Sequence, residues 1–493
     1  MEVLPFSSLI NKLVEFLTVP NGGLMFCSIP FWATFLVFYL IYIGITYRTR
    51  TGMLIYVVLF SLFFFYKANG WLMLLLPATA ILSWYLTRIM DGKEGKQKKG
   101  WLLLLILLNL GPLVYFKYTN FLINTWNEIF TTNFSFLSLV LPIGISFYTF
   151  QSISYSMDIY RGKFNGKVTL LEYLFYLSFF PLLLAGPITR ADTLFPQIRQ
   201  KIRPDNRLLY TGLWLILSGF IKKGLIADYI AQYNNWIFES PLTYSGFENM
   251  MGAVGYSIQI YCDFSGYSDF SIGLAALLGI RLKDNFNFPY QACNLTDFWH
   301  RWHISLSTWF RDYLYIPLGG NRKGDVRTYL NSFITMVVAG LWHGASWMFV
   351  IWGALHGIGL VVHKWCKRHG LDRIPDTRLI IVLSWTATFI YLTITWTFFR
   401  ADSLEICRQI FTQIGTDFDI AYLIPFIKAR PVWCIFVVAA LLFQGIRERH
   451  YQRITDWFIG SHWVIKLILT IFVVQLVLQF HQENVQPFIY YQF

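Results

Sequence analysis

The sequence predicts an all-α, multi-pass integral membrane protein, and three observations carry this prediction. Of the 493 residues, 56% are hydrophobic and only 14% are charged, whereas roughly 25% of residues are charged in a soluble domain. Apolar runs long enough to cross a hydrocarbon core of about 30 Å recur along the chain. Aromatic residues make up 19% of the chain, which suits belts at membrane interfaces. We expect about eleven transmembrane helices, with re-entrant or embedded helices, around a central tunnel.

The charge pattern narrows the classes of partner. A net charge of +13 would suggest nucleic acid as the partner of a soluble protein. Here the basic residues gather in short loops between apolar runs, as in cytoplasmic loops. We therefore expect membrane lipid, and no nucleic acid, as a partner. The six cysteines are scattered and form no CxxC pair, so neither a disulfide framework nor a zinc site is expected.

Two segments of very different length are expected. Residues 1–22 are predicted to be an amphipathic N-terminal extension that lies along the membrane interface. They have no basic n-region and no small-residue cleavage site, so a signal peptide is not expected. Residues 23–493 show no repeat, low-complexity tract or soluble-domain linker, and we expect them to form one transmembrane domain.

The basic loops predict how the first crossings are oriented. Such loops follow the first, third and fifth apolar segments, and an even number of crossings separates each loop from the next. All of them can therefore lie on the cytoplasmic face. These apolar segments lie near residues 30–46, 54–66, 71–87, 101–116 and 139–158.

The apolar stretch 170–187 conflicts with this alternation, because basic residues flank it on both sides. It ends in Ala185-Gly186-Pro187, a sequence that breaks helices. We therefore expect the stretch to be re-entrant. Irregular backbone at membrane depth requires surrounding protein or a water-filled cavity, so a cavity is predicted beside it.

A second excursion is expected at residues 329–363, because the basic regions on both sides of it fit the cytoplasm. His343 lies about 15 residues into this stretch, or about 22 Å at 1.5 Å per residue, near its deepest point. The GxxxG pairs formed by Gly340 with Gly344 and by Gly353 with Gly357 permit close helix packing. Later crossings are expected near residues 379–398, 431–445 and 463–480.

His303 is the second histidine expected in a buried setting. Interpreted as one continuous helix, the segment around it places His303 on an aromatic face and Arg301 on a polar face. The imidazole would then point away from water. The aromatic residues of that face are Trp299, Trp302, Trp309, Phe310 and Tyr313.

A structural role for each histidine stays open, since a buried histidine bonded to a neighbour is ordinary. Ionisable groups at membrane depth are costly, however, and two of them beside a predicted cavity favour a function. The other histidines, His356 included, are expected to be structural. No metal site is expected, because the HxxxH and HxxEH spacings and a cysteine cluster are missing. No GxSxG sequence indicates a serine nucleophile.

Two buried imidazoles without a metal can perform general base catalysis. A neutral imidazole can take the proton of a hydroxyl while that oxygen attacks a thioester. Burial favours the neutral form of the imidazole. A central histidine between two half-tunnels would let a donor from the cytoplasm meet an acceptor outside.

Motifs around both histidines resemble the signatures of the membrane-bound O-acyltransferase family. The first signature covers Asp297–Ser307 and Arg311–Arg322, and the second covers Gly340–Trp347. Within this family the chain is most similar to the bacterial alginate O-acetylation branch. That similarity rests on Leu318–Arg322, Phe399–Ala401 and Phe488–Phe493. Further matches are Leu141–Phe147 and Tyr261–Asp269, and the resemblance covers roughly residues 24–493.

The resemblance implies an O-acyltransferase with His343 as its central catalytic histidine and His303 as the second. It implies a multi-pass protein of the bacterial inner membrane with no bound cofactor. The implied donor is acetyl-CoA, reached from the cytoplasm. The implied acceptor is an extracytoplasmic polysaccharide, modified through a periplasmic or membrane-anchored acetyltransferase partner, as in exopolysaccharide biosynthesis.

Five other residues are expected to line the substrate tunnel. The acidic residues fall in a family motif, where a structural role is equally compatible. The arginines could contact donor phosphates, although snorkelling at helix ends is the alternative. The five residues are Asp263, Asp269, Arg301, Arg311 and Trp342.

Three functional hypotheses follow. The first is an O-acetyltransferase for an exopolysaccharide or peptidoglycan. The second, within the same family, is D-alanyl transfer to teichoic acids from a carrier-protein thioester. The third belongs to another class, a transporter of lipid-linked sugar in which intramembrane histidines relay protons. Only the first two transfer a thioester-borne group, and the identity of the donor separates them.

Overall fold

The computed structural model describes two compact units made of helices. The described residues are 24–46, 48–164, 167–200, 202, 204–370 and 377–480, with residues 15, 18 and 19. Within these ranges the chain contains no strand, which confirms the predicted all-α class. Nearly all of the expected amphipathic extension, residues 1–22, lies outside them. The first unit comprises residues 1–204 and 278–280, and the second comprises residues 205–277 and 281–493.

Several helices are long and apolar enough to cross a membrane, which makes this a multi-pass membrane protein. One run of 42 residues would be about 63 Å long if straight, or twice the hydrocarbon thickness. The total of about eleven crossings stays a prediction. In the described part of the chain the candidates are Ile29–Thr46, Arg50–Asp91, Gly95–Phe130, Trp347–Arg368, Arg378–Arg400 and Trp463–Phe480, with Ile420–Ala429 and Pro431–Gln444 as a pair bent by 103°.

The first unit is built from helices whose ends follow local sequence. Helix α3 begins where the Thr49 side chain accepts a hydrogen bond from the Gly52 amide, and it ends at Gly70, which has φ of 55°. Its helices are α2 (Ile29–Thr46), α3 (Arg50–Asn69), α4 (Leu75–Asp91), α5 (Gly95–Leu113), α6 (Thr119–Phe130), α7 (Ile145–Tyr160), α8 (Leu170–Ser178), α9 (Phe180–Leu183) and α10 (Ala191–Arg199).

The stretch 170–187 is irregular, as expected, but its break lies earlier than the sequence suggested. Helix α8 ends at Ser178 and α9 begins at Phe180, because Phe179 between them adopts a non-helical backbone. Gly186 lies so close to the backbone that a Cβ there would be 2.6 Å from the Leu182 Cα. The segment is buried in protein along almost all of its length. Its re-entrant course and the cavity expected beside it stay predictions.

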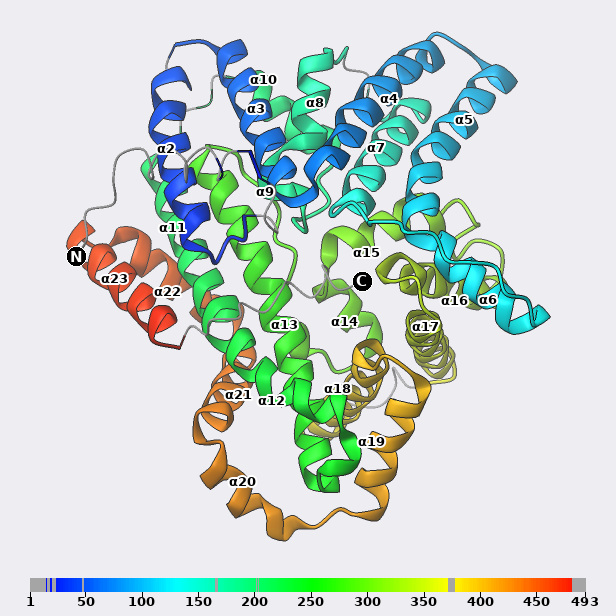
Figure 1. Ribbon diagram of the computed structural model, residues 1–493, viewed down its shortest axis with the longest axis vertical. Coiled ribbons are helices and arrows are strands. Elements are labelled where there is room, and N and C mark those ends of the chain that lie inside the picture. Colours follow the sequence, from blue (N-terminus) through cyan, green and yellow to red (C-terminus); the bar gives the residue numbers. More distant parts are fainter. Residues whose placement is uncertain are drawn as a thin grey trace. The chain divides into compact units, whose positions relative to one another are not determined.

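The second unit is organised around α13, whose 32 residues span about 48 Å. Helix α11 packs against it through glycines: a Cβ on Gly212 would be 2.9 Å from the Gly273 carbonyl oxygen, and one on Gly219 would be 2.9 Å from that of Gly266. The two helices lie side by side in Figure 1. This close packing requires glycine at each crossing point.

The helices of this unit are α11 (Asn206–Gly219), α12 (Asp228–Glu239), α13 (Gly246–Leu277), α14 (Leu295–Arg301), α15 (Ile304–Phe310), α16 (Asp325–His343), α17 (Trp347–Arg368), α18 (Arg378–Arg400), α19 (Leu404–Thr416), α20 (Leu423–Ala429), α21 (Pro431–Gln444), α22 (Glu448–Gly460) and α23 (Trp463–Phe480). A π-helical segment, η3 (Phe220–Ala227), joins α11 to α12.

The excursion predicted at residues 329–363 is a helical hairpin made of α16 and α17. Gly340 and Gly353 face each other across it, since a Cβ on Gly353 would lie 3.2 Å from the Gly340 Cα. Helix α16 ends at His343 because Gly344 adopts an extended backbone, and a Cβ on Gly344 would overlap the Phe349 ring. The glycines thus allow the close packing that the two GxxxG pairs predicted.

Candidate active site

The prediction of one continuous helix around His303 is wrong. Helix α14 ends at Arg301, and His303 has φ of 43° and ψ of 54°, a left-handed conformation that non-glycine residues rarely adopt. The loop containing Asn285 holds this reversal. The Asn285 side-chain oxygen accepts hydrogen bonds from the Ser305 amide (3.1 Å) and hydroxyl (2.9 Å), and the Asn285 carbonyl accepts one from the Ile304 amide (2.9 Å). Long-range bonds therefore outweigh the local helical pattern.

The reversal places the His303 ring in the interior. The residue is completely buried, and the edge of its ring meets Phe264 with centroids 4.6 Å apart. Nδ1 lies 3.2 Å from the Asn285 side-chain oxygen, while Nε2 has no hydrogen-bond partner among the described residues. Burial lowers the pKa of the His303 imidazole to about 3. Burial thus favours the neutral form of the imidazole, and a role for His303 as a base stays a prediction.

His343 ends helix α16 and is also buried, with 3% of its surface exposed. Its ring centroid is 5.1 Å from Trp342, 5.0 Å from Trp352 and 5.3 Å from Phe399. Trp342 also contacts His303, at 6.1 Å. The structure therefore brings three of the predicted site residues, His303, Trp342 and His343, into one buried group.

The group continues to two residues that the sequence analysis did not select. Trp352 contacts His356 with ring centroids 4.8 Å apart, and both side chains are fully buried. His356 had been expected to be structural. We call His303, Trp342, His343, Trp352 and His356 the histidine–tryptophan cluster. Imidazole and indole rings alternate along it.

Asp263 and Asp269 lie on α13, where each forms an ion pair with a lysine of η3. Lys222 Nζ is 2.7 Å from an Asp269 carboxylate oxygen, and Lys223 pairs with Asp263 and, at 2.7 Å, with Asp228. The wider turn of a π-helix brings successive side chains closer in direction, so consecutive lysines can both face α13. These pairs hold α13 against η3. A catalytic role for either carboxylate stays a prediction.

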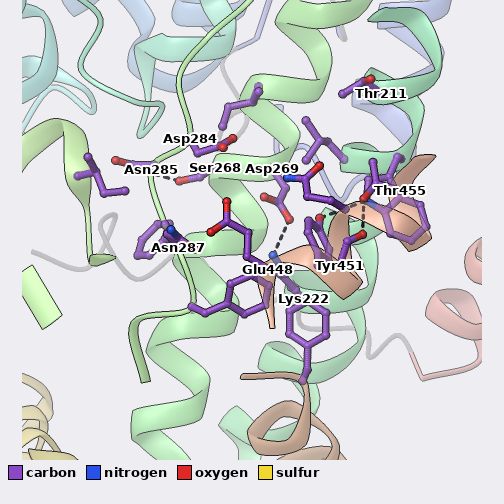
Figure 2. A pocket seen from close by; sticks show the side chains of 18 of the residues that line it. Thr211, Lys222, Ser268, Asp269, Asp284, Asn285, Asn287, Glu448, Tyr451 and Thr455 are labelled. Atoms are coloured by element: carbon purple, nitrogen blue, oxygen red, sulfur yellow. Dashed lines mark hydrogen bonds and ion pairs between the residues drawn. The ribbon is translucent and has the colours of Figure 1, made fainter. Parts of the chain in front are cut away.

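A cavity of about 360 Å³, lined by both polar and apolar side chains, lies close to His303, which is not itself among the lining residues. Lys222 and Asp269 line it together with Asn285, Asp284 and Glu448 (Figure 2). The Asn285 side-chain amide donates a hydrogen bond to the Ser268 hydroxyl (3.2 Å), while its oxygen approaches His303. Asn285 thus separates the cavity from His303. His343 does not line the cavity.

The structure does not bring Arg301 and Arg311 to this cavity. Arg301 Nε donates hydrogen bonds to both carboxylate oxygens of Asp297 (2.9 and 3.0 Å), and Arg311 Nε donates one to Asp312 (2.9 Å). Each guanidinium therefore has a carboxylate partner within its own segment. Contact of either arginine with a donor phosphate stays a prediction.

Comparison with known proteins identifies the family. The sequence model of the membrane-bound O-acyltransferase family matches residues 164–400, which include His303 and His343. A probable alginate O-acetylase of Pseudomonas putida is 37% identical over 427 residues, covering 82% of this chain and 86% of that protein. The chain belongs to the membrane-bound O-acyltransferase family. It is therefore an enzyme, an O-acyltransferase, as the motifs predicted.

Relatives of this O-acyltransferase carry several activities in their names. A peptidoglycan O-acetyltransferase of Helicobacter pylori is 37% identical and covers 71% of each chain. A teichoic acid D-alanyltransferase of Bacillus subtilis is 31% identical and covers 51% of this chain and 67% of that protein. The similarity to the probable alginate O-acetylase of Pseudomonas putida confirms the predicted resemblance to the alginate O-acetylation branch.

Proposed function

We propose that this O-acyltransferase moves an acetyl group from acetyl-CoA, a cytoplasmic thioester donor, across the membrane for O-acetylation of an extracytoplasmic polysaccharide. The observation that carries the proposal is the histidine–tryptophan cluster, which holds the buried His343 at the turn of the α16–α17 hairpin and joins it to His303 through Trp342. The O-acetylating relatives also match more of the chain, at higher identity, than the D-alanyltransferase does.

His343 is the general base in this proposal. Its imidazole takes the proton from the attacking hydroxyl, and the oxygen forms a bond to the thioester carbon. The tetrahedral intermediate collapses, the carbon–sulfur bond breaks, and the thiolate receives the proton from the His343 imidazolium. His303 contacts Trp342, which in turn contacts His343, so we assign His303 to positioning the donor thioester beside His343.

The proposed location and partners rest on the resemblance to the family. We place the enzyme in the bacterial inner membrane, with a periplasmic or membrane-anchored acetyltransferase partner that completes transfer to the polymer. Alginate and peptidoglycan, the acceptors printed in the names of relatives, support a polysaccharide acceptor.

Acetate on surface polysaccharide tests the proposal directly. A null strain complemented with the wild type should regain ester-linked acetate, measured after alkaline release. His343→Ala should reduce it by a factor of about 10² or more, since general base catalysis contributes roughly 10²–10⁴. His450→Ala, which removes an exposed histidine of α22, is the matched control and should restore acetate fully. All variants are compared at equal protein level in the membrane.

The alternatives make different predictions for this experiment. Equal restoration by the wild type and His343→Ala would move catalysis away from His343. No restoration by the wild type would favour the D-alanyl hypothesis. Supplying membranes with acetyl-CoA or with a D-alanyl carrier-protein thioester then identifies the donor, and a transporter would transfer neither group.

A further inference from the structure

Three aromatic side chains, one of which contacts His343, bury polar atoms that have no hydrogen bond to any described residue. The rings of Trp299, Trp352 and His356 contact one another, with centroids 5.2 Å apart for Trp299–His356, 4.8 Å for Trp352–His356 and 5.9 Å for Trp299–Trp352. In the part of the chain that the structure describes, the Nε1 atoms of both tryptophans and both ring nitrogens of His356 are buried without a partner. They come from two elements, α14 and α17.

Packing alone does not explain these residues. Buried polar groups in proteins are almost always hydrogen-bonded, because leaving one unpaired costs free energy. The ring of Phe298 stacks on His356 with centroids 6.3 Å apart, so hydrocarbon aromatic rings already pack in this environment. A phenylalanine at position 356 would fill a similar volume without an unpaired nitrogen. The cost of the histidine therefore calls for a function.

The hydrogen-bonding capacity of the group indicates what it would bind. A neutral imidazole carries one N–H donor, and each indole carries a donor and no acceptor. The group thus offers three N–H donors and a single acceptor. This excess of donors suits a partner that accepts several hydrogen bonds, such as a carbonyl oxygen that becomes negatively charged.

A proton relay from His343 to His356 fits the geometry less well. Trp352 lies between the two imidazoles, with ring centroids 5.0 Å from His343 and 4.8 Å from His356. An indole N–H only donates, so Trp352 cannot accept a proton from one histidine and pass it to the other. Trp352 can, however, place a donor close to the base.

We propose that His356, Trp352 and Trp299 form an oxyanion site, which binds the carbonyl oxygen of the acyl thioester through ring N–H groups. This inference rests on the acyl transfer proposed above and adds a second half to the site. His343 removes the proton from the hydroxyl, and the N–H groups stabilise the charge that forms on the carbonyl oxygen. Fixed donors in a water-excluded site are especially effective at this.

Electrons and atoms balance in this step. The hydroxyl oxygen forms a bond to the carbonyl carbon, and the π electrons move to the carbonyl oxygen, which accepts hydrogen bonds from the N–H groups. When the C=O bond re-forms, the carbon–sulfur bond breaks and the thiolate leaves with the electron pair. The proton held by His343 passes to that sulfur, so the enzyme returns to its starting state.

His356→Phe is the principal test, because it keeps the ring and removes the donor. Inverted membrane vesicles from the complemented null strain, with acetyl-CoA in the medium, retain the enzyme with its natural partners. We expect kcat for acetate transfer to fall by about 10²-fold, the loss measured for single oxyanion donors, while KM for acetyl-CoA changes less than about twofold. An oxyanion donor acts in the transition state, which is why kcat carries the loss. The midpoint of thermal unfolding in detergent should stay equal or rise.

Two further variants keep the result decisive. His356→Gln restores an N–H donor and should recover part of the lost rate. Trp352→Phe keeps an aromatic side chain but removes the indole N–H together with part of the ring, and it should lower kcat even if the His356 variants fold poorly. Tyr391→Phe is the matched control: it removes a nearby hydrogen bond to the Leu355 carbonyl (2.6 Å) and should leave kcat unchanged.

The outcomes separate this inference from the proposed function. A wild-type rate in His356→Phe would overturn the oxyanion site and leave acetyl transfer intact. If the wild type uses a D-alanyl carrier thioester and not acetyl-CoA, the same variants are measured with that donor, because any acyl thioester develops the same oxyanion. A wild type that transfers neither group overturns both proposals.

Discussion

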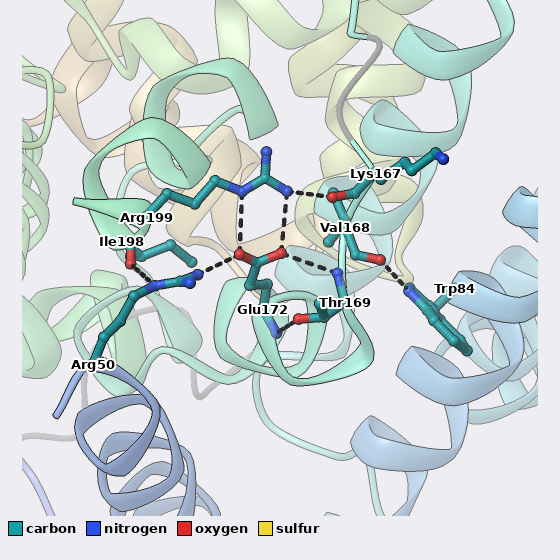
Figure 3. A network of polar contacts seen from close by, with 8 residues as sticks. All are labelled: Arg50, Trp84, Lys167, Val168, Thr169, Glu172, Ile198 and Arg199. Atoms are coloured by element: carbon teal, nitrogen blue, oxygen red, sulfur yellow. Dashed lines mark hydrogen bonds and ion pairs between the residues drawn. The ribbon is translucent and has the colours of Figure 1, made fainter.

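Two buried polar regions of this protein differ in how completely their atoms are hydrogen-bonded. In the first unit, Glu172 is buried at the start of α8, and its carboxylate accepts hydrogen bonds from Arg199 Nε and Nη2 (3.1 Å each), from the Thr169 amide (3.0 Å) and from Arg50 (Figure 3). In the second unit, Nε2 of His303, Nε1 of Trp352 and both ring nitrogens of His356 are buried without a hydrogen bond to any described residue.

The saturated network has a structural role. Arg199 also donates to the Lys167 carbonyl (2.6 Å) and Arg50 to the Ile198 carbonyl (2.8 Å), so the network joins α3, α8 and α10. The Thr169 and Glu172 side chains and amides complete a capping box at the start of α8. A substrate could enter this network only by displacing a hydrogen bond between an arginine and the Glu172 carboxylate. The contrast shows that the Glu172 network is bonded as a structural element is, whereas the cluster keeps hydrogen-bonding capacity that the proposed site would use.

The first way to sharpen this contrast is to disturb the cluster through its packing. A Cβ at Gly353 would lie 3.1 Å from the Val337 Cα and 3.2 Å from the Gly340 Cα, and closer still to the Met336 carbonyl oxygen. These are backbone atoms that cannot move aside. Gly353→Ala should therefore lower the free energy of unfolding by about 1–3 kcal/mol and reduce acetate transfer, because the α16–α17 hairpin carries His343. Thermal unfolding in detergent measures the first effect.

Gly415→Ala in α19 is the control for Gly353→Ala. A Cβ there meets nothing within 4 Å, and alanine favours helix more than glycine does. Its unfolding midpoint should stay the same or rise. A Gly353→Ala protein that unfolds at the wild-type temperature would show that the hairpin is packed less closely than the structure indicates.

The second prediction concerns the saturated network. Glu172→Gln removes the charge but keeps the shape, so two arginines lose their carboxylate partner. We expect a loss of about 1–2 kcal/mol in the free energy of unfolding. This figure is reduced for solvent screening, because the side chains of Arg50 and Arg199 are 40% and 33% exposed. Acetate transfer per folded molecule should not change, unlike in the cluster variants.

An exposed ion pair provides the control for Glu172→Gln. Glu405 pairs with Arg408 on α19, where both side chains are more than half exposed. Glu405→Gln should leave the unfolding midpoint unchanged, since exposed pairs contribute little. A loss of transfer in Glu172→Gln at equal protein level would contradict a purely structural role for the network.

The sequence predicted much of the fold because the fold depends on local properties. Hydrophobic runs and basic loops are local, so the helical class and the hairpin of α16 and α17 were predictable. The GxxxG pairs also predicted the close packing of this hairpin, since glycine has no side chain that would keep two helices apart. The motifs around His303 and His343 predicted the enzyme class, and comparison with known proteins confirmed it.

What the sequence missed depends on contacts between distant segments. The backbone reversal at His303 is fixed by Asn285, which lies 18 residues away, so a helical pattern suggested one continuous helix. The pairing of Lys222 with Asp269 requires η3 to lie against α13, and no pattern within either segment indicates this. His356 was expected to be structural. That both of its ring nitrogens lack a hydrogen bond to any described residue is a property of the tertiary packing, which its sequence neighbours do not indicate.

The last prediction uses pH to isolate the same carboxylate. Burial alone would raise the pKa of Glu172, but hydrogen bonds from Arg199, from the Thr169 amide and from Arg50 outweigh it and lower that pKa from 4.5 to about 2. A carboxyl whose pKa is lower in the folded state stabilises the fold above its unfolded pKa, and this contribution is lost as the pH falls toward the folded pKa. The unfolding midpoints of wild type and Glu172→Gln should therefore differ fully at pH 6, differ by about half as much near pH 3.3, and converge near pH 2. Subtracting the unfolding midpoint of Glu172→Gln from that of the wild type at each pH cancels the effect of all other carboxylates, which titrate in both proteins. A difference that stays constant from pH 6 to pH 2 would mean that the carboxylate charge does not hold α3, α8 and α10 together.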